Sequence, residues 1–234
     1  MTGDGQLGAQ VDWKAARSPD RAMLGGETVR LEPVDAGRDA QALFEASHGP
    51  DTDVKLWNYL PYGPFANVEA FAVWLETCAR SSDPLFLTII DQRTDRAVGM
   101  ASYLRIEPND GVIEIGHIWF AAVLQQTRQA TEAIFLLARQ VFDVLGYRRL
   151  EWKCDALNER SRHAAERFGF TFEGVFRQHH IVKGRNRDTA WFAILDRDWP
   201  IICTAFVQWL ASENFDSAGK QRRSLAAIRD GLIG

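Results

Sequence analysis

Apolar and polar positions change their spacing along the chain, and these changes predict the order of the secondary-structure elements. Three apolar, β-rich runs, at 85–91, 97–107 and 112–120, are separated by the short polar segments 91–95 and 108–111. Connections of this length, rich in Asp, Asn and Gly, are typical of hairpins. The three runs therefore predict an antiparallel meander.

Helical and strand-like segments lie on both sides of this meander. Apolar residues at helical spacing predict four helices, and Gly146 and Gly169 are placed to end the last two. The predicted helices are 38–47, 67–80, 131–145 and 158–168, and the further predicted strands are 28–34, 148–154, 171–183 and 187–196, the last two joined by a turn at 184–187. This order predicts an α+β, or mixed α/β, domain with one central, mostly antiparallel sheet flanked by helices.

The chain divides into three predicted parts. Residues 1–27 have no clear period and read as an extended N-terminal arm, residues 28–198 hold the domain, and residues 199–234 form a helical tail opened by Pro200. The first tail helix has an apolar face, and a weaker helix is predicted over 221–232. Leaving that face in water would be costly, so it either packs on the domain or forms a homodimer. The face comprises Ile201, Ile202, Ala205, Phe206, Trp209 and Leu210.

Composition limits the possible partners. The net charge of −4 provides no general attraction to nucleic acid or to an anionic membrane, so neither partner is expected. Cys78, Cys154 and Cys203 match no metal or disulfide spacing, which favours a reducing, cytoplasmic location. No apolar run approaches the roughly 20 residues of a membrane span, and no secretory signal is expected.

A polar loop follows the strand 112–120 and leads into a helix. The first turn of a helix presents unpaired backbone N–H groups and the positive end of the helix dipole. That combination binds phosphate, so the loop is a predicted phosphate site. Its residues are Gln125, Gln126, Thr127, Arg128, Gln129, Ala130 and Thr131.

A second signature, Asn158-Glu-Arg-Ser161 with Gly169-Phe170 after it, follows this loop. In this order and spacing, the two segments resemble the GCN5-related N-acetyltransferases, and most closely the branch that includes the ribosomal-protein N-terminal acetyltransferases. The loop of that family has the form Gln/Arg-x-x-Gly-x-Gly/Ala. Here Gln125 holds the first position, Ala130 the last, and Arg128 stands where the family usually has Gly.

The resemblance implies a fold and a cofactor. The two central strands are expected to separate near Phe120 and Trp152 and admit acetyl-CoA as co-substrate, with no metal. The pyrophosphate would bind the N–H groups of residues 126–131, and the pantetheine amides would pair with the backbone of Ile118, Trp119 and Phe120 like an added strand. Asn158 caps its helix and can also approach the pantetheine. Arg162 either reaches a phosphate or is solvated.

The resemblance also implies direct transfer of the acetyl group to a primary amine, without an acyl-enzyme. The acceptor would be a protein N-terminus or a small amine. The alternative is a catalytically inactive acetyl-CoA-binding or interaction protein, since Arg128 and Ala165 depart from the family pattern. Ala165 replaces the Tyr that protonates the leaving thiolate in many relatives, which makes Ser161 the candidate proton donor, or else a Ser satisfied by backbone at a helix N-terminus.

An ammonium must lose a proton before it attacks a thioester, so a base is expected. Glu114 is the candidate, or else a Glu that pairs across the strand. His117 would face the other side of a regular strand unless the strand bulges there. One of the adjacent His179 and His180 can face a substrate pocket. The acceptor walls are expected in the loop 49–65, with its aromatic cluster of Trp57, Tyr59 and Tyr62, and in the hairpin at 183–187.

Overall fold

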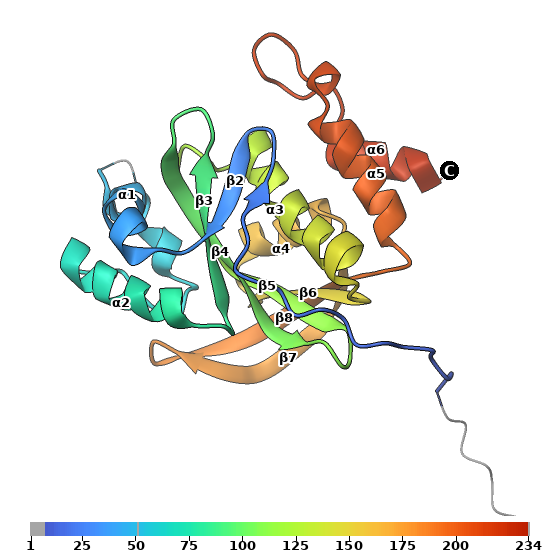
Figure 1. The fold of residues 1–234 in the computed structure, drawn as a ribbon, viewed down its shortest axis with the longest axis horizontal. Helices are drawn as coiled ribbons and strands as arrows, with labels where there is room; N and C mark the ends of the chain where they lie inside the picture. The colour runs from blue at the N-terminus through green and yellow to red at the C-terminus, as the bar shows by residue number, and fades with distance from the viewer. Residues whose placement is uncertain (1–7, 51, 234) are drawn as a thin grey trace, which may run out of the picture.

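A computed structural model describes residues 8–50 and 52–233 of the chain. An eight-stranded sheet with the order β1-β2-β3-β4-β5-β6-β8-β7 runs through the molecule (Figure 1). Every neighbouring pair is antiparallel except β5 and β6, which confirms the predicted fold class. The predictions for residues 1–7 of the arm, for Asp51 and for Gly234 lie outside the described residues. The strands are β1 (Leu24–Gly25), β2 (Val29–Pro33), β3 (Leu85–Asp91), β4 (Arg96–Glu107), β5 (Val112–Phe120), β6 (Arg149–Asp155), β7 (Thr171–Val182) and β8 (Arg185–Leu195).

Helices cover both faces of the sheet. In Figure 1, α1 and α2 lie on one side of the strands, and α3 to α6 lie on the other. Each side has its own apolar core: one contains α1, α2 and Trp119, and the other contains α3, α4 and α5. The helices are α1 (Ala36–His48), α2 (Val68–Arg80), α3 (Arg128–Arg139), α4 (Glu159–Arg167), α5 (Trp199–Leu210) and α6 (Leu225–Ile233), with 3-10 helices η1 (Val54–Trp57) and η3 (Ser212–Asn214) and a π-helix η2 (Gln140–Leu145). None of these described helices is long and apolar enough to cross a membrane.

Local capping explains where the helices begin. The side chain of Asn67 caps α2 as predicted, by accepting a hydrogen bond from the backbone N–H of Ala70. Thr127 caps α3 in the same way, by accepting from the N–H of Ala130. Because Thr127 rather than a later residue is the cap, α3 begins at Arg128, three residues before the predicted start.

The β7–β8 hairpin (orange in Figure 1) has a tighter turn than predicted. Lys183 and Gly184 both have positive φ, at 49° and 72°. Two consecutive residues with positive φ are typical of a type I′ turn, whose twist matches that of the strands. The turn therefore occupies two residues, and β8 begins at Arg185 instead of Arg187.

The tail packs on the domain. The Trp199 ring stacks 5.1 Å from that of Phe142, and the Phe206 ring stacks 5.4 Å from that of Phe135, between ring centroids. Four of the six predicted face residues are buried, whereas Leu210 is half-buried and Ile201 is 39% exposed. This face therefore packs within the chain, as in the first of the two predicted alternatives. The second tail helix, α6, begins at Leu225, four residues after its predicted start. The predicted homodimer stays a prediction.

The N-terminal arm also lies on the domain. The indole N–H of Trp13 donates to the carbonyl oxygen of Asn109 at 2.8 Å, and the N–H of Ala16 donates to that of Pro108. The guanidinium of Arg148 lies over the Trp13 ring. These contacts hold the described part of the arm against the β4–β5 turn.

Candidate active site

The central feature of the candidate site is a gap between β5 and β6. The two strands pair in parallel as far as Ile115 and Trp152. Beyond these residues β5 continues beside β4, and β6 continues beside β8, with no β5–β6 pair in the described residues. Separated parallel strands leave backbone donors and acceptors free along both facing edges, where an extended ligand can pair. Ile118, Trp119 and Phe120 lie on the β5 edge of this gap.

A β-bulge turns His117 toward the α1–α2 side of the sheet. The register between β4 and β5 shifts between Met100 and Ser102, and His117 has a φ of 51°. The imidazole consequently stacks on Tyr62, with centroids 5.5 Å apart, and lies 5.0 Å from the Phe86 ring, on the α1–α2 side of the sheet. A regular strand would point His117 away from Glu114, whereas the bulge brings both side chains to the same face.

The loop before α3 and the first turn of α3 present three backbone donors. The N–H groups of Gln126, Arg128 and Gln129 have no hydrogen-bond partner within residues 8–50 and 52–233, while those of Thr127 and Ala130 are used inside the loop. Free donors at the N-terminus of a 12-residue helix are suited to bind a phosphate.

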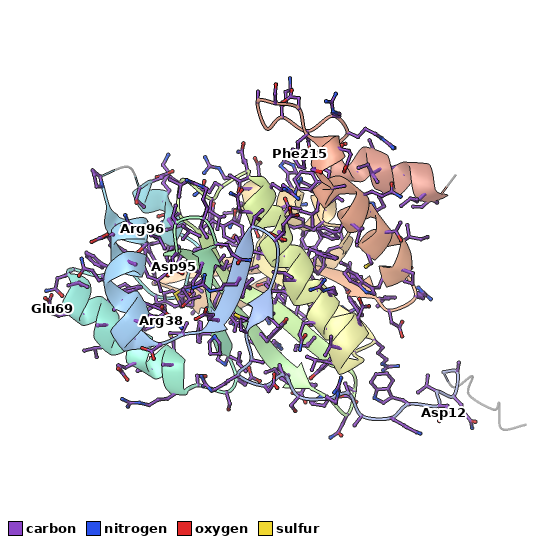
Figure 2. All side chains as sticks on the ribbon, turned by 45° about the horizontal axis from the view of Figure 1, so that its top comes forward. Asp12, Arg38, Glu69, Asp95, Arg96 and Phe215 are labelled. Atoms are coloured by element: carbon purple, nitrogen blue, oxygen red, sulfur yellow. The ribbon has the colours of Figure 1, made fainter. Side chains whose placement is uncertain are left out.

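The guanidinium of Arg128 is already paired within the protein, so it is not a free phosphate ligand. Its guanidinium donates to the carboxylate of Glu27 at 2.6 Å and lies 5.6 Å from the centroid of Phe215, which is labelled in Figure 2. The positive φ in this loop belongs to Gln126, at 60°, and Arg128 is helical. The position where the family usually has Gly therefore does not need glycine here, because the left-handed residue is two positions earlier.

Ser161 lies at the N-terminus of α4, on the α3–α4 side of the gap. Asn158 caps the helix by accepting from the N–H of Ser161 at 3.1 Å. The hydroxyl oxygen of Ser161 accepts from the indole N–H of Trp152 at 3.0 Å. The indole N–H can only donate, so the proton of the Ser161 hydroxyl is not used by Trp152.

Glu114 is buried in a group of charges on the opposite face of the sheet. Its side chain is 7% exposed, and its carboxylate lies 3.0 Å from Lys153 Nζ and 3.8 Å from Arg105 Nε. Lys153 also lies 2.7 Å from the carboxylate of Glu151. Burial raises the pKa of the Glu114 carboxyl above its ordinary value, while Lys153 and Arg105 oppose the rise. A carboxyl with a raised pKa is a better base than an exposed one.

The structure thus separates the predicted residues into two groups. The loop 121–128, Asn158 and Ser161 lie on the α3–α4 side of the sheet, whereas Glu114 lies on the α1–α2 side. Arg162 donates to the carbonyl of Ala156 at 3.4 Å and lies over the Phe172 ring, so its charge is directed toward β7. No group of three or more His, Cys, Asp or Glu side chains in the described chain forms a metal-binding cluster.

Two basic residues that act on the candidate site were not predicted from the sequence. Lys153 pairs with Glu114, and the charge of Arg187 contributes to the lowered pKa of His117. Lys153 alternates with Arg149 and Glu151 in an otherwise apolar strand, and this two-residue period could have revealed a charged face next to Glu114. For Arg187, which was predicted to begin a strand, no local signal distinguishes it from the other arginines of the hairpin.

Comparisons with known proteins agree with this geometry. The family model of the acetyltransferase (GNAT) domain matches residues 28–171, more than half of the chain. A GCN5-related N-acetyltransferase structure from Brucella melitensis is 47% identical, with a TM-score of 0.91, over 94% of this chain and 99% of that one. A "probable acetyltransferase (GNAT family)" structure from Chromobacterium violaceum is 43% identical, with a TM-score of 0.76, over 83% and 96%.

One curated relative carries the word ribosomal in its name. It is the "Putative ribosomal N-acetyltransferase YdaF" of Bacillus subtilis, 31% identical over 101 residues. The match spans 43% of this chain and 55% of that relative. The matching domain model and the extended likeness to the Brucella melitensis structure show that the chain belongs to the GCN5-related N-acetyltransferase (GNAT) family of acetyltransferase enzymes.

Proposed function

We propose that this chain transfers the acetyl group of acetyl-CoA to a primary amine in a ternary complex. The observation that carries the proposal is the gap between β5 and β6, flanked by free N–H donors at the start of α3 on one face and by Glu114 and His117 on the other. A cofactor that enters from the α3–α4 side and an amine that enters from the α1–α2 side would meet in this gap. Holding the two reactants together in this way removes much of the entropic barrier.

The cofactor would bind through backbone groups. Its pyrophosphate would accept hydrogen bonds from the N–H groups of Gln126, Arg128 and Gln129, with the helix dipole adding to the attraction. Its pantetheine would run along the free edge of Ile118 to Phe120, next to the cap residue Asn158. Arg162 would approach the cofactor only after leaving the Ala156 carbonyl.

The reaction needs one base and one acid. The amine nitrogen would form a bond to the thioester carbonyl carbon, and the carbon–sulfur bond would then break. Glu114 would take the proton of the ammonium, directly or through a water molecule. The Ser161 hydroxyl would protonate the departing thiolate, and the second proton that the nitrogen loses on forming the amide would return to Ser161 through solvent. No cysteine nucleophile is required, because the amine attacks the thioester itself.

Two measurements test the proposal. Calorimetry with acetyl-CoA reports cofactor binding, and thiol release over a broad panel of amines, including protein N-terminal peptides, reports turnover. Glu114→Gln is expected to lower kcat/KM about 10²–10⁴-fold while leaving acetyl-CoA affinity nearly unchanged. Glu151→Gln is the matched control, because it removes the other carboxylate paired with Lys153. Ser161→Ala is expected to lower kcat.

The possible outcomes separate the functions. Binding without turnover on any amine would favour an inactive acetyl-CoA-binding protein, and no binding at high micromolar concentration would remove both functions. A loss below about threefold in Glu114→Gln would transfer the role of base to another group such as His117. Mass spectrometry of lysate proteins and metabolites after incubation with the enzyme identifies whether the acceptor is a protein N-terminus or a small amine.

A further inference from the structure

The α1–α2 side of the gap has a surface formed by residues from five separate segments. We refer to Tyr62, His117, Lys153, His179, Arg187 and Trp191 as the acceptor-side surface. Lys153 Nζ lies 3.7 Å from the centroid of the Trp191 ring, and the imidazole of His179 lies 6.0 Å from the same ring. Tyr62 and His117 stack at its other end. Side chains from the loop 49–65, β5, β6, β7 and β8 therefore converge beside the place where β5 and β6 separate.

Several polar atoms on this surface have no partner within the protein. They are buried, yet no atom of residues 8–50 or 52–233 forms a hydrogen bond with them. Most buried polar groups in proteins are hydrogen-bonded, so a group of exceptions in one place requires an explanation. The atoms are Tyr62 Oη, His117 Nδ1, His179 Nδ1, Arg187 Nε and Trp191 Nε1. All but the histidine nitrogens, whose role depends on the tautomer, can donate a hydrogen bond, so the surface is suited to an acceptor-rich ligand.

Arg187 has no anionic partner among the described residues, whereas Lys153, the other cation of this surface, is paired. The carboxylates of Glu114 and Glu151 already pair with Lys153. No carboxylate of the described residues lies within 4.0 Å of the Arg187 guanidinium, and no hydrogen bond joins it to them. The neighbouring Asp188 is occupied elsewhere, because its side chain accepts from the N–H of Gln178 at 2.7 Å and from the Asn186 amide at 2.9 Å.

The cations of this region also lower the pKa values of the neighbouring histidines. Burial and, to a smaller extent, the charge of Arg187 lower the pKa of His117 to about 4. Burial lowers the pKa of His179, and the charges of His180, Arg105, Arg187 and Lys153 lower it as well. A place that disfavours additional positive charge on imidazole favours a negatively charged ligand for the same reason.

We propose that the acceptor-side surface selects amines that carry an anionic group close to the amine nitrogen, and that Arg187 binds this anion. The inference rests on the proposed acetyl transfer and names its substrate class. A carboxylate matches the planar fork of a guanidinium, which can form two parallel charge-assisted hydrogen bonds. Arg187 lies four residues before Trp191 on β8, so the two share the face of the strand on which Trp191 contacts Lys153. The charge of Arg187 also acts on His117, so the anion and the reacting amine would belong to the same small part of the acceptor.

Two sources offer this chemistry, and matched pairs of acceptors distinguish them. The first pair is the amidated peptides Asp-Ala-Ala and Asn-Ala-Ala, which differ in a side-chain carboxylate near a peptide N-terminus. The second pair is alanine and alaninamide, which differ in the α-carboxylate of a free amino acid. Thiol release from acetyl-CoA is measured for each. We expect kcat/KM to be about 10–100-fold higher for the anionic member of at least one pair, as for a charge-assisted bond.

Variants of the full chain test the role of Arg187. Arg187→Gln is expected to reduce the preference to within about threefold without changing acetyl-CoA affinity in calorimetry. Arg185→Gln is the matched control, since Arg185 is an exposed arginine at the start of the same strand. The preference should survive in this variant. An equal or higher kcat/KM for the neutral member of both pairs would overturn the proposal, and so would an equal loss for both members in Arg187→Gln.

A binding experiment keeps the test independent of turnover. Coenzyme A-loaded protein is titrated calorimetrically with the N-acetylated products of the four acceptors. Tighter binding of an anionic product, lost in Arg187→Gln, supports the inference even if no amine in the panel is acetylated, in which case the proposed function alone fails. Equal affinity for anionic and neutral products overturns the inference and leaves the proposed acetyl transfer intact.

Discussion

The carboxylate of Glu132 connects α3 to the segment before β2, and its replacement tests how the loop 121–128 is held in place. Glu132 accepts from the backbone N–H groups of Glu27 at 2.6 Å, Thr28 at 2.8 Å and Val29 at 3.2 Å, and from the hydroxyl of Thr28. Its side chain is buried at 7% exposure. Since the same segment supplies the Glu27 carboxylate that holds Arg128, the contact connects β2 to the candidate phosphate site.

The expected magnitude follows from these four bonds. A hydrogen bond to a charged group contributes roughly 1.5–3 kcal/mol, and a buried donor left without a partner costs about as much. The four bonds share one carboxylate, so their contributions are not additive. We expect Glu132→Ala to lower the free energy of unfolding by about 4 kcal/mol. Glu132→Gln keeps one acceptor oxygen but turns an NH₂ group toward backbone donors, so about 3 kcal/mol is expected.

Urea denaturation and thermal unfolding measure this loss. For a chain of this size, each kcal/mol shifts Tm by about 2–4 °C, so Glu132→Gln should unfold roughly 6–12 °C earlier. Acetyl-CoA affinity is expected to fall as well, because the start of α3 loses its connection to β2. Glu159→Gln, an exposed first-turn glutamate of α4, is the matched control. A loss below about 1 kcal/mol in Glu132→Ala would refute the reasoning, since the backbone donors would then find other partners.

Three further changes have expected outcomes. Phe206→Ala should lower the free energy of unfolding in urea by about 3–5 kcal/mol, because Phe206 is 1% exposed between α5 and the domain. Val207→Ala, at 55% exposure, should change it little, and equal effects of the two variants would contradict the docked tail. The pKa of His117 is lowered to about 4, against an ordinary 6.5, so the unfolded chain binds the proton first as pH falls. The free energy of unfolding should therefore decline by about 3 kcal/mol between pH 7 and pH 4, and His117→Gln should remove that part of the decline. Gly99→Ala places a Cβ 2.5 Å from the carbonyl oxygen of Trp119, so β4 and β5 must move apart. We expect the free energy of unfolding in urea to fall by about 2–3 kcal/mol and acetyl-CoA binding in calorimetry to weaken. Unchanged stability and affinity would show that the two strands separate at no cost.

Local patterns in the sequence were sufficient to predict most of the architecture. Alternation and turn residues predicted the β3–β4–β5 meander, and helical spacing with the caps Asn67 and Asn158 predicted α2 and α4. The start of α3 was predicted three residues late, because the cap Thr127 was not recognised. Periods and caps depend on residues within about four positions of one another, so they can be read from the chain itself. The candidate phosphate loop was predicted for the same reason, because free N–H groups at a helix start are a local property, whereas Ser161 became a candidate through the family resemblance.

Tertiary packing decided what the side chains of the candidate site contact. The β-bulge that turns His117 toward Glu114 arises in the register between β4 and β5. Glu132 finds its donors about 100 residues earlier in the chain, and Arg128 finds Glu27 at a similar separation. Tyr62 contacts His117, and Lys153 contacts Trp191, only because separate segments pack beside the gap. Contacts of this kind depend on how distant elements pack, and neither the spacing nor the type of a residue carries that information.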